Sequence, residues 1–497
     1  MKKHRFKVLS LLLALSLTAA GCGKTAGTAS SADSAGTSSA QTAESVSAGS
    51  AAAAESTASA QAADSQSAQT ESTPAAAEDT GYGVSPAAAT DQYTLKKVVI
   101  MSRHNIRAPL SGGDSLLGKM TPHSWFPWTS NASELSLKGG ILETMMGQYF
   151  KKWMESEGLI PENYHPAEGE VRFYANAKQR TQATARYFAS GMLPTAPIEI
   201  EQHVEFDTMD PVFTPQITVL NGEIEDTLLS EIAGMGGESG IAGLGDDLAD
   251  AYALLADVLD VEESEAYKSG EFTGFKTDDT EIVLTVNEEP GMKGSLKTAT
   301  SLSDALILQY YENLDDKEAA FGHDLTKEDW LKLASIKDAY SDILYTGPSM
   351  SVNIAHPLLQ EIYSELNAEG RIFTFLCGHD SNIAGILAAM QVQDYSLPET
   401  LERKTPIGFK LVFEIWEKDG EEYCAVNLCY QSTDQIRNLT SLSLEEPPVI
   451  VSMNFNGLEK NEDGLYRRAD VENRLMEAIS AYDELPADTE EELAPAA

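Results

Sequence analysis

The sequence predicts an α/β protein, in which helices cover both faces of a sheet and a mostly helical cap is inserted. Short apolar runs typical of buried strands alternate with longer segments whose apolar residues recur at helical spacing. Polar and charged residues directly follow several of these runs, as they do where open α/β sheets bind ligands. Between residues 207 and 294 the alternation gives way to acidic, glycine-interrupted helical sequence, which we interpret as the cap.

The expected elements follow from these patterns in chain order. Apolar runs rich in β-branched and aromatic residues predict strands at 96–101, 171–175, 372–377, 408–416 and 422–430. Amphipathic segments predict helices at 137–157, 179–191, 296–312, 328–345, 352–367 and 383–390, with a further helix at 244–259 in the cap. The α/β domain is therefore expected to comprise residues 91–206 and 295–483.

Both ends of the chain differ from this domain. Basic residues, an apolar run and small residues leading into Cys22 predict a lipoprotein signal peptide at 1–22, with Cys22 as the lipidated residue. The Ala/Ser/Thr-rich segment 23–90 predicts a disordered tether, and the acidic segment 484–497 a disordered tail. We therefore expect an extracytoplasmic protein, lipid-anchored to the outer face of a bacterial cytoplasmic membrane.

The composition limits the possible partners. A formal net charge of -42 argues against nucleic acid and anionic membrane surfaces, so membrane contact is expected only through the lipid anchor. If Cys22 is lipidated, the remaining cysteines, Cys377, Cys424 and Cys429, allow at most one disulfide. No Cys/His spacing indicates zinc, and the oligomeric state stays open.

The most informative segment is Ser102–Pro109, which follows an apolar run. It places His104 between Arg103 and Arg107 at the end of an expected strand. Arginine presents a planar fork that suits phosphate oxygens and stays charged at any working pH. Positive neighbours also favour the neutral, nucleophilic form of a histidine. The segment therefore predicts a site that binds a phosphate group and attacks it.

Two later segments have the same arrangement of a strand followed by a helix. Arg180 lies near the start of a helix after the strand at 171–175. His379 and Asp380 follow the strand at 372–377 and a glycine turn. All three segments place polar side chains at the carboxyl ends of strands, where we expect them to meet.

These segments resemble the histidine acid phosphatases, which are marked by Arg-His-x-x-Arg-x-Pro, a later Gln-Arg-Thr and a late His-Asp. Further matches indicate the glucose-1-phosphatase and phytase branch, including Asn105 where most of the family has glycine. The resemblance covers about residues 93–482 and rests on Met101–Leu110, Leu137–Gly140, Thr208–Pro211, Glu289–Gly291, Gly378–Ala384, Thr405–Gly408 and Tyr430–Ser432.

The resemblance implies a phosphoglycerate-mutase-like (histidine phosphatase) fold and hydrolysis of phosphomonoesters through a phosphohistidine. His104 is then the nucleophile, and Asp380 protonates the leaving oxygen and later accepts a proton from water. The phosphoryl oxygens are expected to be held by Arg103, Arg107, Arg180 and His379. In this branch the glutamate of Glu-Pro-Gly reaches the substrate from the cap, which corresponds to Glu289. No metal or cofactor is expected, because arginines supply the positive charge.

The substrate class and one non-enzymatic function stay open. Glucose 1-phosphate-like sugar phosphates and phytate are both possible substrates, whereas a secreted mutase has little to isomerise. A surface lipoprotein that only binds sugar or inositol phosphates needs the arginines, but it needs neither a nucleophile nor an adjacent acid. The pair His104 and Asp380 therefore favours an enzyme.

The other histidines are expected to lie outside the reaction. His123, near Trp125 and Trp128, is compatible with a pocket-lining role and with simple packing. His165 and His203 are expected at the surface, and His356 is expected to be structural. The tripeptide containing His323 copies Gly378–Asp380 without a preceding strand, so we interpret the likeness as incidental.

Overall fold

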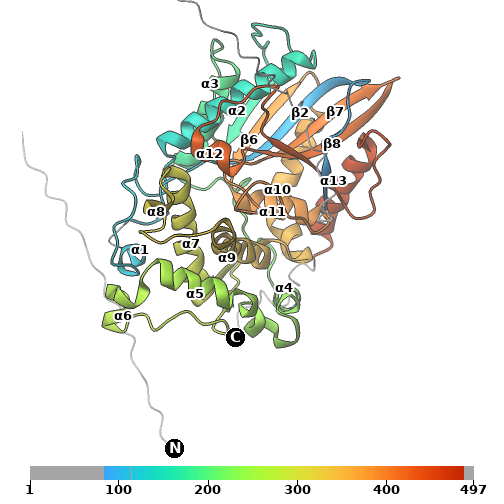
Figure 1. The fold of residues 1–497 in the computed structure, drawn as a ribbon. Helices are drawn as coiled ribbons and strands as arrows, with labels where there is room; N and C mark the ends of the chain where they lie inside the picture. Colours follow the sequence, from blue (N-terminus) through green and yellow to red (C-terminus); the bar gives the residue numbers. More distant parts are fainter. Residues whose placement is uncertain (1–82, 113–114, 486–497) are drawn as a thin grey trace, which may run out of the picture. The chain divides into compact units, whose positions relative to one another are not determined.

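The computed structural model describes residues 83–112 and 115–485, shown as a coloured ribbon in Figure 1. The expected signal peptide with Cys22, most of the expected tether and nearly all of the expected tail lie outside the described residues. Within them, no helix has both the length and the apolar character needed to cross a bilayer.

A central sheet of eight strands organises the α/β part. Its strands are adjacent in the order β1-β9-β8-β7-β2-β6-β3, and β10 pairs with β8. Strand β6 lies parallel to β2 on one side and to β3 on the other, whereas β2 and β7 are antiparallel. The strands are β1 (Val84–Pro86), β2 (Thr94–Arg103), β3 (Val171–Ala175), β6 (Phe373–Gly378), β7 (Lys410–Lys418), β8 (Glu421–Tyr430), β9 (Val449–Met453) and β10 (Tyr466–Arg467).

Helices cover both faces of this sheet (Figure 1), which confirms the predicted fold class. Successive side chains of a strand point to opposite faces. Accordingly Val98 and Ile100 of β2 pack in the hydrophobic cluster formed with α2 (Leu137–Ser156) and α3 (Gln179–Met192). Val99 and Met101 pack in the cluster on the other face. That face is covered by α10 (Pro348–Asn367), α11 (Asp380–Ala389) and α13 (Arg468–Asp483).

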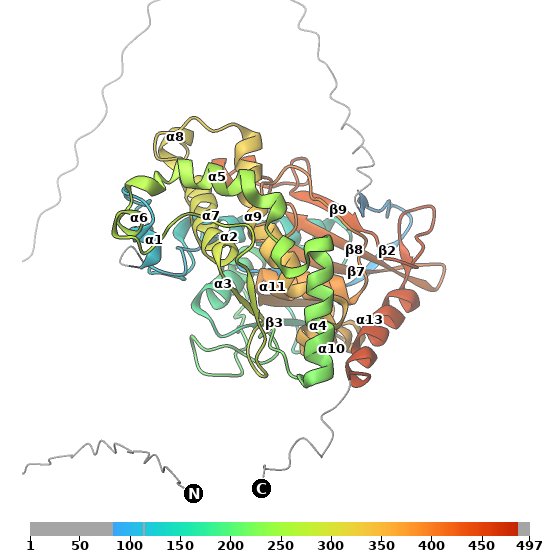
Figure 2. The same ribbon diagram turned by 90° about the horizontal axis from the view of Figure 1, so that it is seen from below.

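The expected cap segment contains helices and one short hairpin, which Figure 2 shows from below together with the adjoining helices. Its regular elements are α4 (Gly222–Met235), α5 (Ala249–Val258), α6 (Glu265–Ser269), three short 3-10 helices and the strands β4 (Glu281–Val283) and β5 (Gly291–Lys293). Buried side chains of α4 and α5 share one hydrophobic cluster with those of later helices. The adjoining helices are α1 (Leu116–Lys119), α7 (Ser295–Glu312), α8 (Asp316–Ala319) and α9 (Lys327–Tyr345). The domain boundary at residue 294 stays a prediction.

The end of the expected tether was placed wrongly. Residues 84–86 form β1, which pairs antiparallel with β9, and Val84 is buried against the sheet. A single apolar residue among small polar ones carries no strand pattern, so backbone pairing with a distant strand decides its conformation. Strand β9, helix α13 and the short helix α12 (Thr433–Asn438) were also not predicted.

Candidate active site

Three neighbouring parallel strands bring the predicted segments to one edge of the sheet. Arg103 at the end of β2 is in register with Gly378 at the end of β6, and Ala175 of β3 is in register with Cys377. Because β6 lies between the other two, its loop stands between theirs. The structure therefore places the three predicted segments together at the carboxyl ends of neighbouring parallel strands.

The imidazole of His104 is held with one particular nitrogen free. Its Nδ1 lies 2.9 Å from the backbone oxygen of Asn105. A carbonyl oxygen can only accept, so Nδ1 carries the proton and Nε2 keeps its lone pair. Burial, followed by the nearby Arg180 guanidinium, lowers the pKa of His104 well below its usual value. His104 is therefore a neutral imidazole with a nucleophilic nitrogen available.

The ring of His379 lies 5.5 Å from that of His104 between centroids and is also oriented. The Oδ1 of Asn176 accepts from the backbone N–H of Asp210, so its Nδ2 donates to His379 Nε2 at 2.7 Å. The proton of His379 is then on Nδ1, which faces Arg180 Nη2 at 3.4 Å. Two donors facing each other require an acceptor between them, as an anion provides.

The arginines of the site are buried, with unused donors. Arg103 is 1% exposed and Arg107 is 6% exposed. The Nε–H groups of Arg103, Arg107 and Arg180 are buried without any hydrogen-bond partner. Burying an N–H without an acceptor costs about 1–3 kcal/mol, so three such groups on the arginines that act on His104 indicate an anion-binding site. Burial lowers the pKa of Arg180 to about 10, and this guanidinium still carries its charge at neutral pH.

Carboxylates bind the outer ends of two of these arginines. Arg107 Nη2 donates to Asp304 Oδ2 at 2.9 Å. Arg103 Nη1 donates to Glu402 Oε1 at 2.8 Å and to the backbone oxygen of Thr405 at 2.5 Å. These contacts hold the outer ends of both guanidinium groups, whose Nε–H groups remain without a partner.

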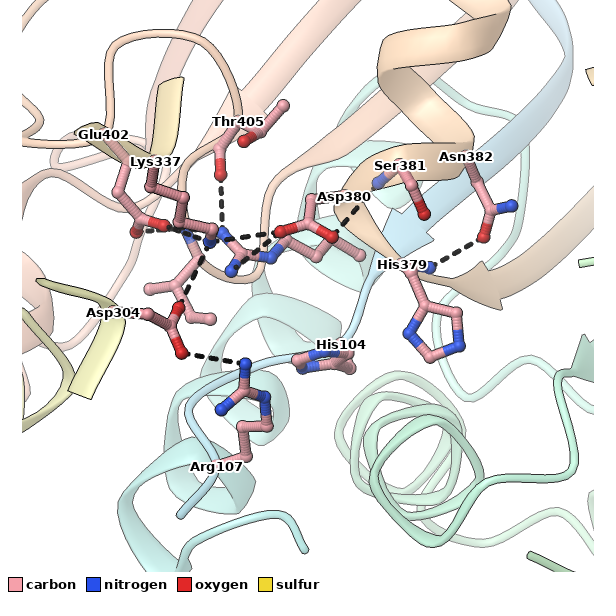
Figure 3. A network of polar contacts seen from close by, with 12 residues as sticks. His104, Arg107, Asp304, Lys337, His379, Asp380, Ser381, Asn382, Glu402 and Thr405 are labelled. Atoms are coloured by element: carbon pink, nitrogen blue, oxygen red, sulfur yellow. Dashed lines mark hydrogen bonds and ion pairs between the residues drawn. The ribbon is translucent and has the colours of Figure 1, made fainter. Parts of the chain in front are cut away.

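Asp380 begins α11 and is bound by two cations (Figure 3). Its Oδ2 lies 3.0 Å from Lys337 Nζ and 3.4 Å from Arg103 Nη2. Burial would raise the pKa of Asp380, but Lys337 and Arg103 lower it well below its usual value. In the empty site Asp380 is therefore ionised.

Glu289 reaches the same site from the loop between β4 and β5. Loss of surrounding water raises its pKa, Asp380 raises it further, and Arg180 opposes the change. Glu289 thus lies within electrostatic reach of Asp380 and Arg180. Its contact with a substrate stays a prediction.

A buried ion pair supports the loop that carries His104. Lys410 Nζ lies 3.0 Å from Glu143 Oε1, and both side chains are fully buried. The same Glu143 oxygen accepts from Asn105 Nδ2 at 2.8 Å. Gly408, with φ of +67°, packs against this amide, where a Cβ atom would collide with it. The pair therefore fixes Asn105, whose carbonyl sets the tautomer of His104.

The other histidines in the described part of the chain lie away from this centre. His123 stacks on Phe321 and its Nε2 lies 2.7 Å from Asp260, so the structure places it in packing. His165 and His203 are exposed, as expected. His356 stacks on Tyr482, and His323 lies 3.8 Å from carboxylates outside the site.

Within the described residues, Cys377, Cys424 and Cys429 are buried free thiols.

Four important residues were not predicted, namely Asn176, Asp304, Lys337 and Glu402. Two signals were available. Lys337 stands on the apolar side of its helix, near Leu333 and Leu344, where an unpaired lysine is unfavourable. Glu402 precedes the matched segment Thr405–Gly408 by three residues. Neither signal identifies the residue with which Lys337 or Glu402 forms an ion pair, because the partners lie on separate elements of the chain.

The comparisons with known proteins agree with this geometry. Residues 94–230 match the family model of the histidine phosphatase superfamily, branch 2. The chain is 36% identical to a glucose-1-phosphatase of Salmonella typhimurium over 75% of this chain and 89% of the relative. It is 34% identical to a glucose-1-phosphatase of Providencia rettgeri over 78% and 92%. The solved structure of Hafnia alvei phytase in complex with myo-inositol hexakis sulphate is 25% identical, with a TM-score of 0.71 and coverage of 80% and 100%.

These relatives are named as phosphatases, and the alternative of a non-catalytic binding lipoprotein finds no support among them. The match extends over most of each relative, and the family model spans His104 and the arginines Arg103, Arg107 and Arg180. The chain belongs to the histidine phosphatase superfamily, branch 2, and is a phosphoric monoester hydrolase.

Proposed function

We propose that this protein is an acid phosphatase that hydrolyses sugar phosphates through a phosphohistidine on His104. The observation that carries the proposal is the set of buried, unpartnered Nε–H donors of Arg103, Arg107 and Arg180 around this ring. A phosphoryl group accepts hydrogen bonds on every peripheral oxygen and would satisfy these donors. His379 Nδ1–H supplies a further donor to the same group.

The first step transfers the phosphoryl group to His104. The Nε2 lone pair attacks phosphorus, a P–N bond forms and the ester P–O bond breaks. Asp380 protonates the departing oxygen, and the guanidinium groups stabilise the charge on the peripheral oxygens. In the second step Asp380 accepts a proton from water, the resulting hydroxide oxygen bonds to phosphorus, and the P–N bond breaks.

Charge favours substrates that carry a single phosphate. Glu289 and Asp380 bring negative charge to the site. Of its three arginines, Arg103 and Arg107 form salt bridges with carboxylates, whereas none is found for Arg180 among the described residues. Glu289 would repel the additional phosphates of an inositol polyphosphate, and the neighbouring Lys178 and Lys297 would offset that repulsion in part. Phytate is the second candidate, because the similar Hafnia alvei phytase is bound to an inositol hexakis sulphate.

The place of action follows from the N-terminal sequence alone. We infer that the enzyme works outside the cytoplasm, anchored through a lipid on Cys22, because basic, apolar and small residues precede that cysteine in the order of a lipoprotein signal. Globomycin treatment of cells that express the full chain tests this. Accumulation of an uncleaved precursor is expected, and unchanged processing contradicts the lipid anchor.

The catalytic proposal is tested by His104→Ala. Turnover of glucose 1-phosphate and of p-nitrophenyl phosphate should fall by several orders of magnitude, as loss of a nucleophile does. Rapid acid quench of the unsubstituted enzyme should trap an acid-labile phosphoenzyme that the variant does not form. His165→Ala, at an exposed position, is the matched control and should retain full turnover. Retained turnover in His104→Ala with an intact fold contradicts the proposal.

A further inference from the structure

Lys337 is the meeting point of three carboxylates in the site. Its Nζ lies 3.0 Å from Asp380 Oδ2, 3.0 Å from Glu402 Oε1 and 3.4 Å from Asp304 Oδ1 (Figure 3). The side chain reaches these groups from α9 and is 11% exposed. An ammonium group has three N–H donors, and here each has a carboxylate within ion-pair distance.

The charges around Asp380 come from every element that packs near it. The cations are Lys337 from α9, Arg103 from β2 and Arg180 from α3. The acidic neighbours are Glu289 from the β4–β5 loop, Asp304 from α7 and Glu402. His104 and His379 are buried and neutral, because burial and the arginines lower the pKa of each well below its usual value.

The empty site is close to electrical balance. Arg103, Arg107 and Lys337 are each paired with at least one of Asp304, Asp380 and Glu402. Asp380 is then ionised, because an opposite charge this close stabilises its carboxylate. An ionised carboxylate cannot protonate a leaving group, so the resting site is not ready for the first step of the proposed reaction.

Arrival of a phosphate group removes this balance. A tetrahedral dianion seated on the arginine Nε–H groups places two negative charges beside Asp380 and competes for the cations that stabilise it. A proton on Asp380 offsets one of these two negative charges within the buried site. We propose that Lys337 is a positioning residue that keeps Asp380 ionised in the empty site, and that binding of a tetrahedral dianion is coupled to uptake of one proton by Asp380.

This inference rests on the proposed function of the same site and adds the origin of the acid. The proton comes from solvent when the anion binds, passes from Asp380 to the leaving oxygen as the ester P–O bond breaks, and is replaced from water in the second step. After each transfer to the leaving group, Asp380 returns to the ion pair with Lys337. The acid is thus formed only when a substrate occupies the site.

Proton uptake is measurable without any turnover. Inorganic sulfate is a dianion throughout the working pH range and carries no proton of its own, so it serves as the probe. Isothermal titration in buffers of different ionisation enthalpy, repeated between pH 4 and pH 8, should show close to one proton taken up per sulfate at acid pH and none at the alkaline end. Asp380→Asn should bind sulfate without uptake. Uptake that persists in this variant assigns the proton to His104, His379 or Glu289 and overturns the proposal, as does the absence of uptake in the unsubstituted enzyme.

The role of Lys337 is tested by the pH at which proton uptake on sulfate binding ceases. Lys337→Met removes a cation 3.0 Å from Asp380, so the pH at which uptake ceases should rise by about one unit or more. The alkaline limb of kcat for an alkyl phosphate should move the same way, and that for p-nitrophenyl phosphate should move little. Lys337→Arg should restore both the pH at which uptake ceases and the alkaline limb of kcat. A rise in KM at every pH with no movement of either transition shows that Lys337 binds the phosphate directly and overturns the proposal.

Controls separate these results from general damage and from failure of the proposed function. Lys332→Met alters an exposed lysine on the same helix and should leave every profile unchanged. If Lys337→Met does not fold, Lys337→Arg and Asp380→Asn still decide whether uptake occurs and where. Uptake without a trapped phosphoenzyme refutes only the phosphohistidine, whereas a phosphoenzyme without uptake refutes only this inference.

Discussion

At the scale of single residues, each functional group is oriented by a contact on its far side. The backbone carbonyl of Asn105 accepts from His104 Nδ1 and so holds the proton there. Asn176 donates to His379 Nε2, which leaves the proton of His379 on Nδ1 as well. Glu402 binds the outer end of Arg103, and Asp304 that of Arg107. Since these partners satisfy the outer donors, the groups that face the centre of the site are left free for a ligand.

Glu289 is the residue whose substitution should alter substrate preference. Glu289→Gln removes negative charge near Arg180 while keeping the shape of the side chain. We expect the ratio of kcat/KM for phytate to that for glucose 1-phosphate to rise on the order of tenfold, or about 1.4 kcal/mol of transition-state free energy. Side-by-side kinetics with release of free phosphate as the readout measures this. An unchanged ratio would show that Glu289 does not face the second phosphate.

At the scale of elements, the site depends on close contact between a loop and a helix start. The first turn of α2 packs against the loop after β2, where Ser136 caps the helix through the N–H of Gly139. A Cβ atom at Gly139 would collide with the backbone oxygen of Ile106 and lie 3.1 Å from Leu135 Cδ1. Glycine is therefore required here by space. The contact transmits the position of α2 to the segment that carries His104 and Arg107.

Gly139→Ala tests this contact. Overpacking should lower the free energy of unfolding by about 1–3 kcal/mol. Displacement of the loop should also lower kcat, because the site requires accurate placement of His104. Gly222→Ala, in the first turn of α4, has open space around the added methyl group and should lower neither quantity. Denaturant unfolding and steady-state kinetics measure both, and full kcat in Gly139→Ala would show that the loop adapts.

At the scale of the whole molecule, the sheet forms two hydrophobic clusters, one on each face, with few charges inside. Glu414 of β7 is one exception, 8% exposed on the side that packs against α2. It accepts from Asn427 Nδ2 at 2.7 Å and from Trp416 Nε1 at 3.0 Å. Burial raises the pKa of Glu414 to about 7. The carboxyl is therefore protonated in the folded protein at mildly acidic pH.

This residue makes folding stability depend on pH. Its pKa is higher in the folded chain, so its contribution is complete below about pH 4.5 and is lost as the pH rises to about 7. The loss is about 3 kcal/mol, and Glu414→Gln should remove that part of the slope in urea unfolding at pH 4.5 and pH 7. Glu417→Gln, on the same strand but partly exposed, should leave the slope unchanged. Equal slopes in Glu414→Gln and the unsubstituted protein would contradict a buried neutral carboxyl.

Periodicity along the chain predicted the principal strands, most long helices and the edge of the sheet where the site lies. The apolar runs at β2, β3 and β6 are local patterns that need no knowledge of partners. Strand β9 and helix α13 also carry usable patterns, namely Val449–Val451 and the spacing of Val471, Leu475 and Ile479. Strand β1 has no such pattern, because its conformation depends on pairing with β9.

The linear order of residues was also sufficient to place Arg103, His104, Arg107, Arg180, His379 and Asp380 at one edge, because each follows a recognisable strand. It did not reveal that Lys337, Asp304 and Glu402 join them. Those residues lie on separate elements, and their ion pairs bridge 33 to 299 positions of sequence, such as Arg103 with Glu402 and Lys337 with Asp304. Charge–charge energies depend on distance in space, which the order of residues does not contain. Local pattern therefore defines which groups react, and long-range packing sets the charge that they carry.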